Sequence, residues 1–267
     1  MTSSNNVWAD EAPLYSQTRP APPLALTEIL TQMIHTPRPA LVVDLGSGTG
    51  LSTMIWGESA ERVIGIEPSD EMRSEANHAL TANPHLSSIT YKAGVAHQTE
   101  LPHNSVDVVT CAQSFHWMEP TSTLVEIARI LRPGGVFAAY DYDWPPIVGW
   151  ELEKVYEKLE ERFDQLMATR GGANRAPKWS KAKHLENLRN SGYFRFTREL
   201  LLHHREEGDA TRFFDLMMTN GYSFHIRQGL VTTEELKADE LKNAAQQFIG
   251  AKPTPFYFSY RVRIGVK

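Results

Sequence analysis

The stretch Val42-Val43-Asp44-Leu45-Gly46-Ser47-Gly48-Thr49-Gly50 decides the fold of this chain. Its apolar beginning is typical of a buried strand, and its three alternating glycines are typical of a tight turn. Leu51, Met54 and Ile55 then return at helical spacing. The stretch therefore predicts a strand, a glycine-rich loop and a helix, an arrangement that brings free backbone N–H groups close to a ligand.

Strands and helices alternate at a regular spacing beyond this stretch. Further strands are predicted over residues 62–67, 89–93, 106–112 and 136–140. Helices are predicted over 24–34, after a cap at Ser69 or Asp70, and over 121–131, where Arg132-Pro133-Gly134-Gly135 ends the helix. This alternation predicts an α/β fold, a Rossmann-like, doubly wound and mostly parallel sheet with helices on both faces. Ligands bind beyond the carboxyl ends of the strands in such sheets.

The pattern changes after Asp141. The remaining chain predicts helices over 151–166, 184–190, 210–218 and 234–248, and strands over 194–204 and 256–266. With these two late strands the sheet is expected to have seven strands, of which the last is antiparallel. We expect one structural domain with four segments: an N-terminal lid and first helix (1–37), a cofactor-binding core (38–145), a helical cap insertion (146–192), and the remainder of the sheet with further cap helices (193–267).

The composition excludes several classes of protein. The single cysteine, Cys111, allows no intrachain disulfide and no thiolate metal cage. The net charge of -5 argues against a nucleic-acid partner, because such binding depends on surplus Lys and Arg. We find no secretory signal and no apolar run long enough to cross a bilayer, so a cytoplasmic protein without a membrane partner is expected. The expected partner is a small-molecule substrate, and the sequence indicates no oligomeric state.

The charges around the glycine loop favour a cationic ligand. Leu51 stands where the dinucleotide pattern GxGxxG would place its third glycine. Asp44 ends the strand before the loop, where it would repel a pyrophosphate and attract the ammonium and sulfonium groups of S-adenosylmethionine. Glu67 ends the next strand, where a carboxylate accepts hydrogen bonds from ribose hydroxyls in either cofactor class. The structural alternatives are that Asp44 caps the following turn and that Glu67 is a solvated strand end.

Several motifs together resemble those of class I S-adenosylmethionine-dependent methyltransferases, in particular methyltransferase type 11 and trans-aconitate methyltransferase-like proteins. The motifs are Val42 to Gly50, Ile66-Glu67-Pro68-Ser69, Gly94-Val95-Ala96, Val106 to Trp117, and Leu131-Arg132-Pro133-Gly134-Gly135. The resemblance is strong over the first half of the chain and weak over the rest. It is specific for the cofactor and nearly silent on the substrate.

The resemblance implies a set of residues that bind S-adenosylmethionine. Gly46, Ser47 and Gly48 would pass under the methionine moiety, and Met72 would pack near the adenine. Asp44 would contact the amino end of the methionine and Glu67 the ribose. The remaining expected cofactor-binding residues are Gly50, Pro68, Ala96, Ala112 and Gln113.

The N-terminal segment Tyr15-Ser16-Gln17-Thr18-Arg19-Pro20 is similar to the family's Y-x-x-x-R-P entry. The resemblance implies that Arg19 holds the cofactor carboxylate and that Tyr15 closes over it; the alternative is a surface arginine and a core tyrosine. The chain departs from the family pattern at Val95-Ala96-His97. Adenine recognition there would rest on backbone groups.

Residues for catalysis and substrate binding are expected after the fourth and fifth strands. His116 is the candidate general base, because an imidazole accepts a proton from a hydroxyl or carboxylic acid near neutral pH; the alternative is a residue that orders the loop. Trp117, Gln113 and, after the fifth strand, Asp141, Tyr142, Asp143 and Trp144 are expected to face the same site.

The basic stretch Arg170, Arg175, Lys178, Lys181 and Lys183 around Trp179 would suit an anionic substrate, although such charge runs are often simply solvated. The pair His203-His204 lacks further ligands at metal spacing, and no metal is expected.

The predicted function is therefore S-adenosylmethionine-dependent methyl transfer to an oxygen, nitrogen or carbon of a small molecule, such as an acidic metabolite. Two alternatives remain: a non-catalytic regulator that binds an adenosine cofactor, and an NAD-dependent oxidoreductase.

Overall fold

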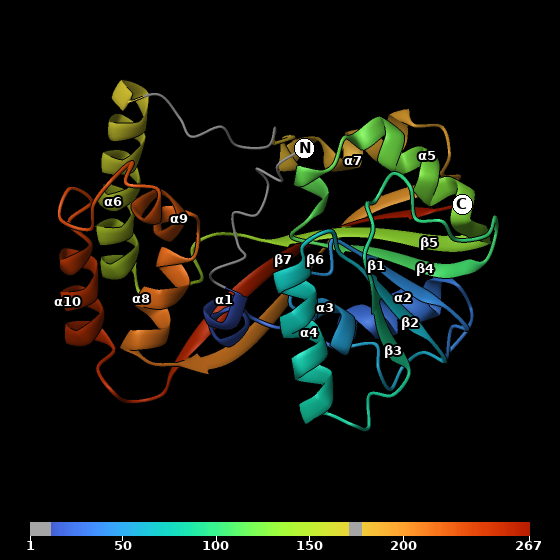
Figure 1. Cartoon of the computed structure of the whole chain (residues 1–267), viewed down its shortest axis with the longest axis horizontal. Coiled ribbons are helices and arrows are strands. Elements are labelled where there is room, and N and C mark those ends of the chain that lie inside the picture. Colours follow the sequence, from blue (N-terminus) through green and yellow to red (C-terminus); the bar gives the residue numbers. More distant parts are fainter. Residues whose placement is uncertain (1–11, 171–177) are drawn as a thin grey trace. The chain divides into compact units, whose positions relative to one another are not determined.

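A computed structural model describes residues 12–170 and 178–267 of the chain. Within them the strands are β1 (Val42–Leu45), β2 (Val63–Ile66), β3 (Ile89–Lys92), β4 (Val106–Ala112), β5 (Leu131–Tyr142), β6 (Phe196–Gly208) and β7 (Thr254–Val266). They form a seven-stranded sheet in the order β3-β2-β1-β4-β5-β7-β6 (Figure 1). The first five strands pair in parallel, and β7 runs antiparallel to β5. The predicted Rossmann-like fold is confirmed.

The strand order reverses beside β1, which places the glycine loop at the edge where ligands bind in such sheets. β1 is buried along its whole length and pairs with β2 on one side and β4 on the other. The carboxyl ends of all three strands therefore meet at one edge. This edge carries the predicted cofactor residues.

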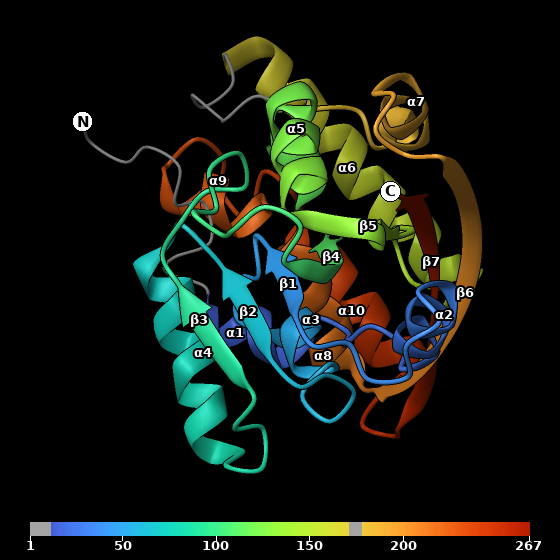
Figure 2. The same cartoon turned by 90° about the vertical axis from the view of Figure 1, so that its right-hand side faces the viewer.

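The described residues also form α-helices. They are α1 (Ala12–Thr18), α2 (Ala25–Met33), α3 (Leu51–Met54), α4 (Asp70–Ala82), α5 (Pro120–Ile130), α6 (Trp150–Arg170), α7 (His184–Asn190), α8 (Ala210–Met218), α9 (Tyr222–Arg227) and α10 (Ala238–Phe248). Within the sheet unit, helices cover both faces of the sheet (Figures 1 and 2). α5 and α7 lie on one face, and α2, α3 and α4 lie on the other (Figures 1 and 2). Across 12–170 and 178–267, no helix is both long enough and apolar enough for a membrane span.

Side-chain caps fix the starts of two of these helices. The Ser69 hydroxyl accepts a hydrogen bond from the backbone N–H of Met72 at 3.2 Å, which confirms the predicted cap of α4. The Glu119 carboxylate accepts from the backbone N–H groups of Thr121 and Ser122, and Pro120 occupies the first helical position of α5. Both helices therefore begin directly after segments that bear motif residues.

The apolar core beneath α5 supports the strand ends on which the site is built. Phe115 packs edge-on against Phe137, with ring centroids 5.5 Å apart. The same cluster contains the fully buried Ile127 of α5 and Leu188 of α7. Phe115 follows β4, and Phe137 lies in the neighbouring strand β5. Their packing therefore joins β4 and β5 to both helices.

The strand predicted over 136–140 begins earlier than expected and includes Arg132-Pro133-Gly134-Gly135, the residues predicted to end the preceding helix. α5 already ends at Ile130, and β5 begins at Leu131, which pairs with Val106. The proline has no N–H to lose, and the backbone of Gly134 donates to the carbonyl of Lys267 at 3.0 Å. Pairing with distant strands therefore extends β5 through residues that resemble a helix terminator.

The predicted helix over 234–248 begins later than expected. Lys237 has a positive φ of 52° and precedes α10, while Thr232 and Glu235 form a separate turn by reciprocal backbone-to-side-chain hydrogen bonds. This reciprocal pairing is a capping box that opens a short turn, and the positive φ of Lys237 separates that turn from α10. α1 and α9 were not predicted.

The chain divides into two compact units, and the division passes through β6 and β7. In the described residues the sheet unit comprises 21–142, 178–203 and 259–267, and the helical unit comprises 12–20, 143–170 and 204–258. These units cut across the predicted segments 1–37 and 146–192. The four predicted segments stay predictions.

Substitution of Glu126 tests how α5 is attached to the loop after β3. Its carboxylate accepts from Arg129 Nε at 2.6 Å and from the backbone N–H of Thr99 at 2.8 Å. The hydrogen bond from Arg129 lowers the pKa of Glu126 to about 2. Glu126→Gln should therefore reduce the free energy of unfolding at pH 7 by about 1–2 kcal/mol.

The pH dependence of this loss follows from the sign of the shift. Because the folded-state pKa lies below the ordinary value of 4.5, the stabilisation is present at neutral pH and is lost as the pH falls from 4.5 towards 2. Denaturant unfolding at a series of pH values should show the difference between the two proteins shrink over this range. Glu28→Gln, at an exposed position of α2, is the control. If the difference in unfolding free energy between the native chain and Glu126→Gln stays the same at low pH, the lowered pKa assigned to Glu126 is contradicted.

Candidate functional site

The glycine loop is folded back onto the sheet edge. The backbone N–H groups of Gly46 and Ser47 donate to the carbonyl of Ile66 at 2.8 and 3.2 Å. Gly46 has a φ of +66°, and a Cβ there would lie 2.7 Å from the Cβ of Ser114. Glycine is therefore required at this position both by the backbone conformation and by the close approach of the segment after β4.

The middle of the loop is open. A Cβ added at Gly48 would meet no atom within 4 Å, and its φ of +55° favours glycine. On either side, the buried hydroxyls of Ser47 and Thr49 have no hydrogen-bond partner among the described residues. Buried polar groups are normally paired, so the loop offers both space and unused hydrogen-bonding groups to a ligand.

Asp44 is a buried centre of hydrogen bonds. Its carboxylate accepts from the hydroxyls of Ser52 at 2.6 Å, Thr53 at 2.8 Å and Thr110 at 2.7 Å. The side chain is completely buried, and burial raises its pKa despite these three hydrogen bonds. Two of these hydroxyls come from α3, so the carboxylate joins the end of β1 to the helix after the loop. A carboxylate has about four acceptor positions, so a fourth donor can still be accommodated.

Glu67 joins the glycine loop to the start of α4 by two hydrogen bonds. One carboxylate oxygen accepts from the backbone N–H of Gly48 at 3.0 Å, and the other accepts from that of Ser69 at 2.9 Å. The residue is only 9% exposed, and burial raises its pKa. The alternative of a solvated strand end was therefore wrong. Each oxygen keeps a further acceptor position beside the loop.

The other cofactor residues predicted for this unit lie around the same strand ends. Met72 is buried in the first turn of α4, and Pro68 is exposed before it. Ala96 is nearly buried after β3 and packs into the core, while Ala112 is half-buried at the end of β4. Gly50 adopts a φ of +89° directly before α3. Their roles in cofactor binding stay predictions.

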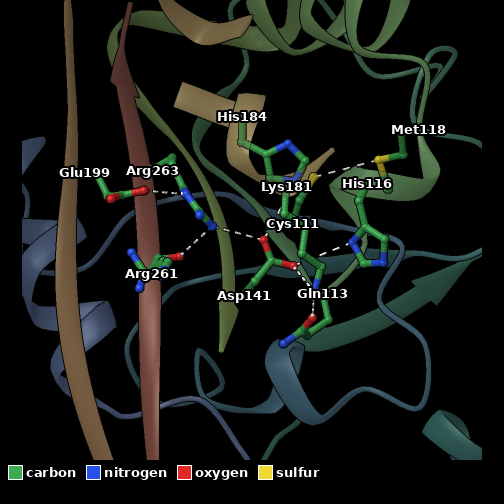
Figure 3. A network of polar contacts seen from close by, with 10 residues as sticks. All are labelled: Cys111, Gln113, His116, Met118, Asp141, Lys181, His184, Glu199, Arg261 and Arg263. Carbon is green, nitrogen blue, oxygen red and sulfur yellow. Dashed lines mark hydrogen bonds and ion pairs between the residues drawn. The ribbon is translucent and has the colours of Figure 1, made fainter. Parts of the chain in front are cut away.

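A second polar cluster lies after β4 and β5. Gln113 follows β4 with a φ of +50°, His116 lies in the 3-10 turn Phe115–Trp117, and Asp141 lies in the last part of β5. His116 Nδ1 lies 3.6 Å from Asp141 Oδ1, and the second ring nitrogen is on the side away from Asp141 (Figure 3). The predicted candidates Gln113, His116 and Asp141 are thus brought together.

Lys181 bridges the two strand ends. Its ammonium group lies 3.0 Å from Asp141 Oδ1 and donates to Gln113 Oε1 at 2.7 Å. The side chain is 41% exposed. The predicted basic stretch therefore contributes one lysine directly to this cluster, although as the partner of a carboxylate rather than as a separate anion site.

Three further residues surround Asp141 and were missed as site residues. Arg263 Nη1 lies 3.1 Å from Asp141 Oδ2, and its Nε donates to Glu199 at 2.7 Å. His184 Nε2 lies 3.7 Å from Asp141 Oδ2 (Figure 3). No local motif marks them, because they come from β7, β6 and α7.

The charges of this cluster follow from burial and pairing. Although burial favours the neutral acid, contacts with His116 and Lys181 hold the pKa of Asp141 well below its usual range. Burial lowers the pKa of His116, and burial lowers that of His184 to about 4. At neutral pH the cluster therefore contains an ionised Asp141 and two uncharged imidazoles.

Trp117 and Tyr142 are the remaining predicted substrate-binding residues of the sheet unit. The ammonium group of Lys178 lies 4.4 Å from the ring centroid of Trp117, within the range of a cation–π contact. Tyr142 is buried and packs edge-on against Tyr260. Of the remaining basic residues, Lys183 is exposed, and Arg175 lies outside the described residues.

Tyr15, Arg19 and Trp144 belong to the helical unit and form a cluster of their own. The guanidinium of Arg19 lies 4.8 Å from the ring centroids of both Tyr15 and Trp144, and donates to the carbonyl of Thr219 at 2.8 Å. Trp144 donates to the hydroxyl of Tyr156 at 2.7 Å. The cluster joins α1 to α8 and α6 within the unit. Its expected contacts with cofactor and substrate stay predictions.

Substitution of Asp44 tests whether its carboxylate organises the loop. Asp44→Ala removes the common acceptor of three buried hydroxyls and should cost about 2–3 kcal/mol in the free energy of unfolding. Asp44→Asn should cost less, because the amide keeps one acceptor oxygen and a threonine hydroxyl can rotate to accept from its NH₂ group. Denaturant unfolding would measure both. Equal losses in the two variants would show that the hydroxyl network is not what stabilises the loop.

Comparisons with known proteins agree with this geometry. Residues 43–139 match the family described as Methyltransferase domain. An uncharacterized methyltransferase of Mycobacterium tuberculosis is 36% identical over 122 residues, which are 45% of this chain and 46% of that protein. A "probable S-adenosylmethionine-dependent methyltransferase" of Saccharomyces cerevisiae is 27% identical over 175 residues, 61% of this chain and 60% of the relative.

Similarity to a solved structure extends further along the chain. A "putative type II methyltransferase" from Anaeromyxobacter dehalogenans has a TM-score of 0.67 and 26% identity, with 93% of this chain and 97% of that chain covered. In contrast, this chain matches only about half the length of the Mycobacterium relative. The family match over residues 43–139 lies within the sheet unit that carries the glycine loop.

Proposed function

Residues 43–139 are a methyltransferase domain of the class I, Rossmann-like type, and from this premise we propose that the chain transfers a methyl group from S-adenosylmethionine to a small-molecule acceptor. The observation that carries the proposal is the open glycine loop between two buried carboxylates, Asp44 and Glu67. A ligand at this loop would meet two negative charges. A cationic cofactor suits that environment better than a pyrophosphate does.

The residues present fit the cofactor. The open position at Gly48 gives room for the methionine portion, and the unpartnered hydroxyls of Ser47 and Thr49 are available to it. Asp44 retains an acceptor position for a methionine ammonium, and Glu67 retains positions for ribose hydroxyls. When bound, S-adenosylmethionine supplies a methyl carbon that its sulfonium group activates.

His116 is the general base of the proposed reaction. Asp141 lies beside its Nδ1, so the other nitrogen, Nε2, is left to take the proton of an acceptor hydroxyl or acid. The deprotonated acceptor atom is then the nucleophile, and Asp141 stabilises the imidazolium that forms. At 3.6 Å this contact is electrostatic rather than a hydrogen bond, and it favours the protonated ring.

The proposed acceptor is a small molecule with an acidic group. The support for this is Lys178, whose ammonium group lies 4.4 Å from the ring centroid of Trp117. Lysine acts as a point charge that attracts carboxylate or phosphate oxygens. The identity of the accepting atom is left open between oxygen, nitrogen and carbon.

Glu67→Gln tests cofactor binding. The carboxylate accepts two backbone N–H bonds, and an amide must turn its NH₂ group towards one of them. We expect affinity for S-adenosylmethionine, measured by calorimetry, to fall at least about tenfold. Glu61→Gln, an exposed change in the segment before β2, should leave the affinity unchanged.

Two results of this titration would count against the proposal. No heat of binding at millimolar S-adenosylmethionine would remove its basis. Tight binding of NADH in place of S-adenosylmethionine would support the oxidoreductase alternative, since the same loop geometry serves pyrophosphate in other proteins.

His116→Ala tests the base. Removal of a general base should lower turnover by about 10²–10⁴-fold while S-adenosylmethionine affinity stays within about twofold. Turnover is measured with labelled cofactor on an acceptor found by screening acids, phenols and amines. Unchanged turnover would rule out the base role. If no acceptor of any kind is methylated, the non-catalytic regulator becomes the better description.

A further inference from the structure

Three side chains from separate elements converge on one small volume beside β5. Potential ligand atoms of His116, Asp141 and His184, one from each residue, all lie within 4.8 Å of one another. The three residues are 8%, 5% and 0% exposed. They come from the turn after β4, the end of β5 and the start of α7 (Figure 3).

The two imidazoles in this cluster have unused nitrogens. Neither ring nitrogen of His184 has a hydrogen-bond partner in the described part of the chain, and the same holds for Nδ1 of His116. Their contacts with Asp141, at 3.7 and 3.6 Å, are longer than hydrogen bonds. An unpaired buried polar group is costly, and here such groups face one another around a single carboxylate. One occupant that binds all three would satisfy them.

We propose that His116, Asp141 and His184 form a binding site for a divalent transition-metal ion, with Zn²⁺ as the ion of best fit. Two imidazole nitrogens and one carboxylate oxygen suit Zn²⁺ and its neighbours in the first transition row. Mg²⁺ and Ca²⁺ prefer oxygen ligands throughout. Three protein ligands also leave one position of a tetrahedral ion open, as in zinc sites that bind water or substrate.

The spacing of the donors can be compared with what the ion requires. Donor atoms at about 2.0–2.2 Å from a tetrahedral zinc ion lie roughly 3.4 Å from one another. His116 Nδ1 lies 3.6 Å from Asp141 Oδ1 and His184 Nε2 lies 3.7 Å from Asp141 Oδ2, while one donor from each of the three residues lies within 4.8 Å of the other two. The side chains therefore have to move inward for all three donors to reach one ion.

Lys181 is the residue that must move when the ion binds. Asp141 and Glu199 carry two negative charges, while Lys181 and Arg263 carry two positive charges, so this group is neutral. A dication in place of the Lys181 ammonium changes the net charge only to +1. Lys181 is 41% exposed and can swing into solvent, whereas Arg263 is 6% exposed and remains paired with Glu199. Lys181 and the metal ion therefore compete for Asp141.

Metal binding has a consequence for the reaction that rests on the proposed function. A neutral imidazole that donates its Nδ1 lone pair to a metal must carry its proton on Nε2. Nε2 of His116 then cannot accept a proton from the acceptor. Zn²⁺ is thus expected to inhibit methyl transfer.

The binding test needs neither cofactor nor acceptor. The untagged full chain is treated with a chelator, dialysed and titrated with Zn²⁺ by calorimetry, and Co²⁺ is used as a spectroscopic probe of the ligand set. We expect one ion per chain. Lys181→Ala should tighten Zn²⁺ binding about tenfold, because it removes a competing cation. His184→Asn should weaken binding at least about tenfold, and His85→Ala, an exposed change elsewhere, should have no effect.

The Lys181 variant keeps the test decisive even if the buried His184 variant fails to fold. If Lys181 had a purely structural role, Lys181→Ala would not increase the affinity for Zn²⁺. The proposal is overturned if neither the native chain nor Lys181→Ala binds Zn²⁺ or Co²⁺, or if folded His184→Asn binds as well as the native chain. Binding without inhibition would support the site and contradict the base role of His116 instead.

Discussion

The buried carboxylate of Asp44 is the interaction on which the cofactor edge of this chain depends. It joins β1, on which it lies, to the start of α3 through Ser52 and Thr53, and to β4 through Thr110. α3 follows β1 closely in the sequence, whereas Thr110 of β4 is 66 residues from Asp44, and β1 and β4 pair where the strand order reverses. The hydroxyl donors make a buried charge tolerable in a place where an unpaired one would be very costly. The hydrogen bonds of Asp44 to α3 and β4 therefore hold the elements beside the glycine loop in place.

Buried carboxylates are used in two different ways at neighbouring strand ends. Asp44 accepts hydrogen bonds from three neutral hydroxyls and burial raises its pKa, so a cationic ligand would stabilise its ionised form. Asp141 is surrounded by Lys181 and Arg263, so its charge is already balanced within the protein. The first arrangement suits the binding of a positive cofactor. The second arrangement holds several side chains, His116 among them, near Asp141. It also places Lys181 there as a cation that a metal ion can displace.

The parts of the site that the sequence predicted are those built from local segments. Asp44, the glycine loop and the Ser69 cap lie within short stretches whose spacing alone determines their geometry. The strands β1 to β4 were predicted because their apolar runs are bounded by clear turn residues. By contrast, β5 extends over a proline and two glycines because Leu131 pairs with Val106, a contact that no local pattern encodes.

The environment of Asp141 could not be predicted for the same reason. Arg261 lies directly opposite Asp141 in the antiparallel pair of β5 and β7, and Arg263 lies opposite Ala139. Residues two apart on a strand share a face, so Arg263 is the diagonal neighbour of Asp141 and its long side chain reaches the carboxylate. This contact depends on the register of two strands separated by more than a hundred residues. A shift of one residue would turn Arg263 to the other face of the sheet. The charge balance of Asp141, and with it the competition between Lys181 and a metal ion, is therefore set by strand pairing rather than by any motif.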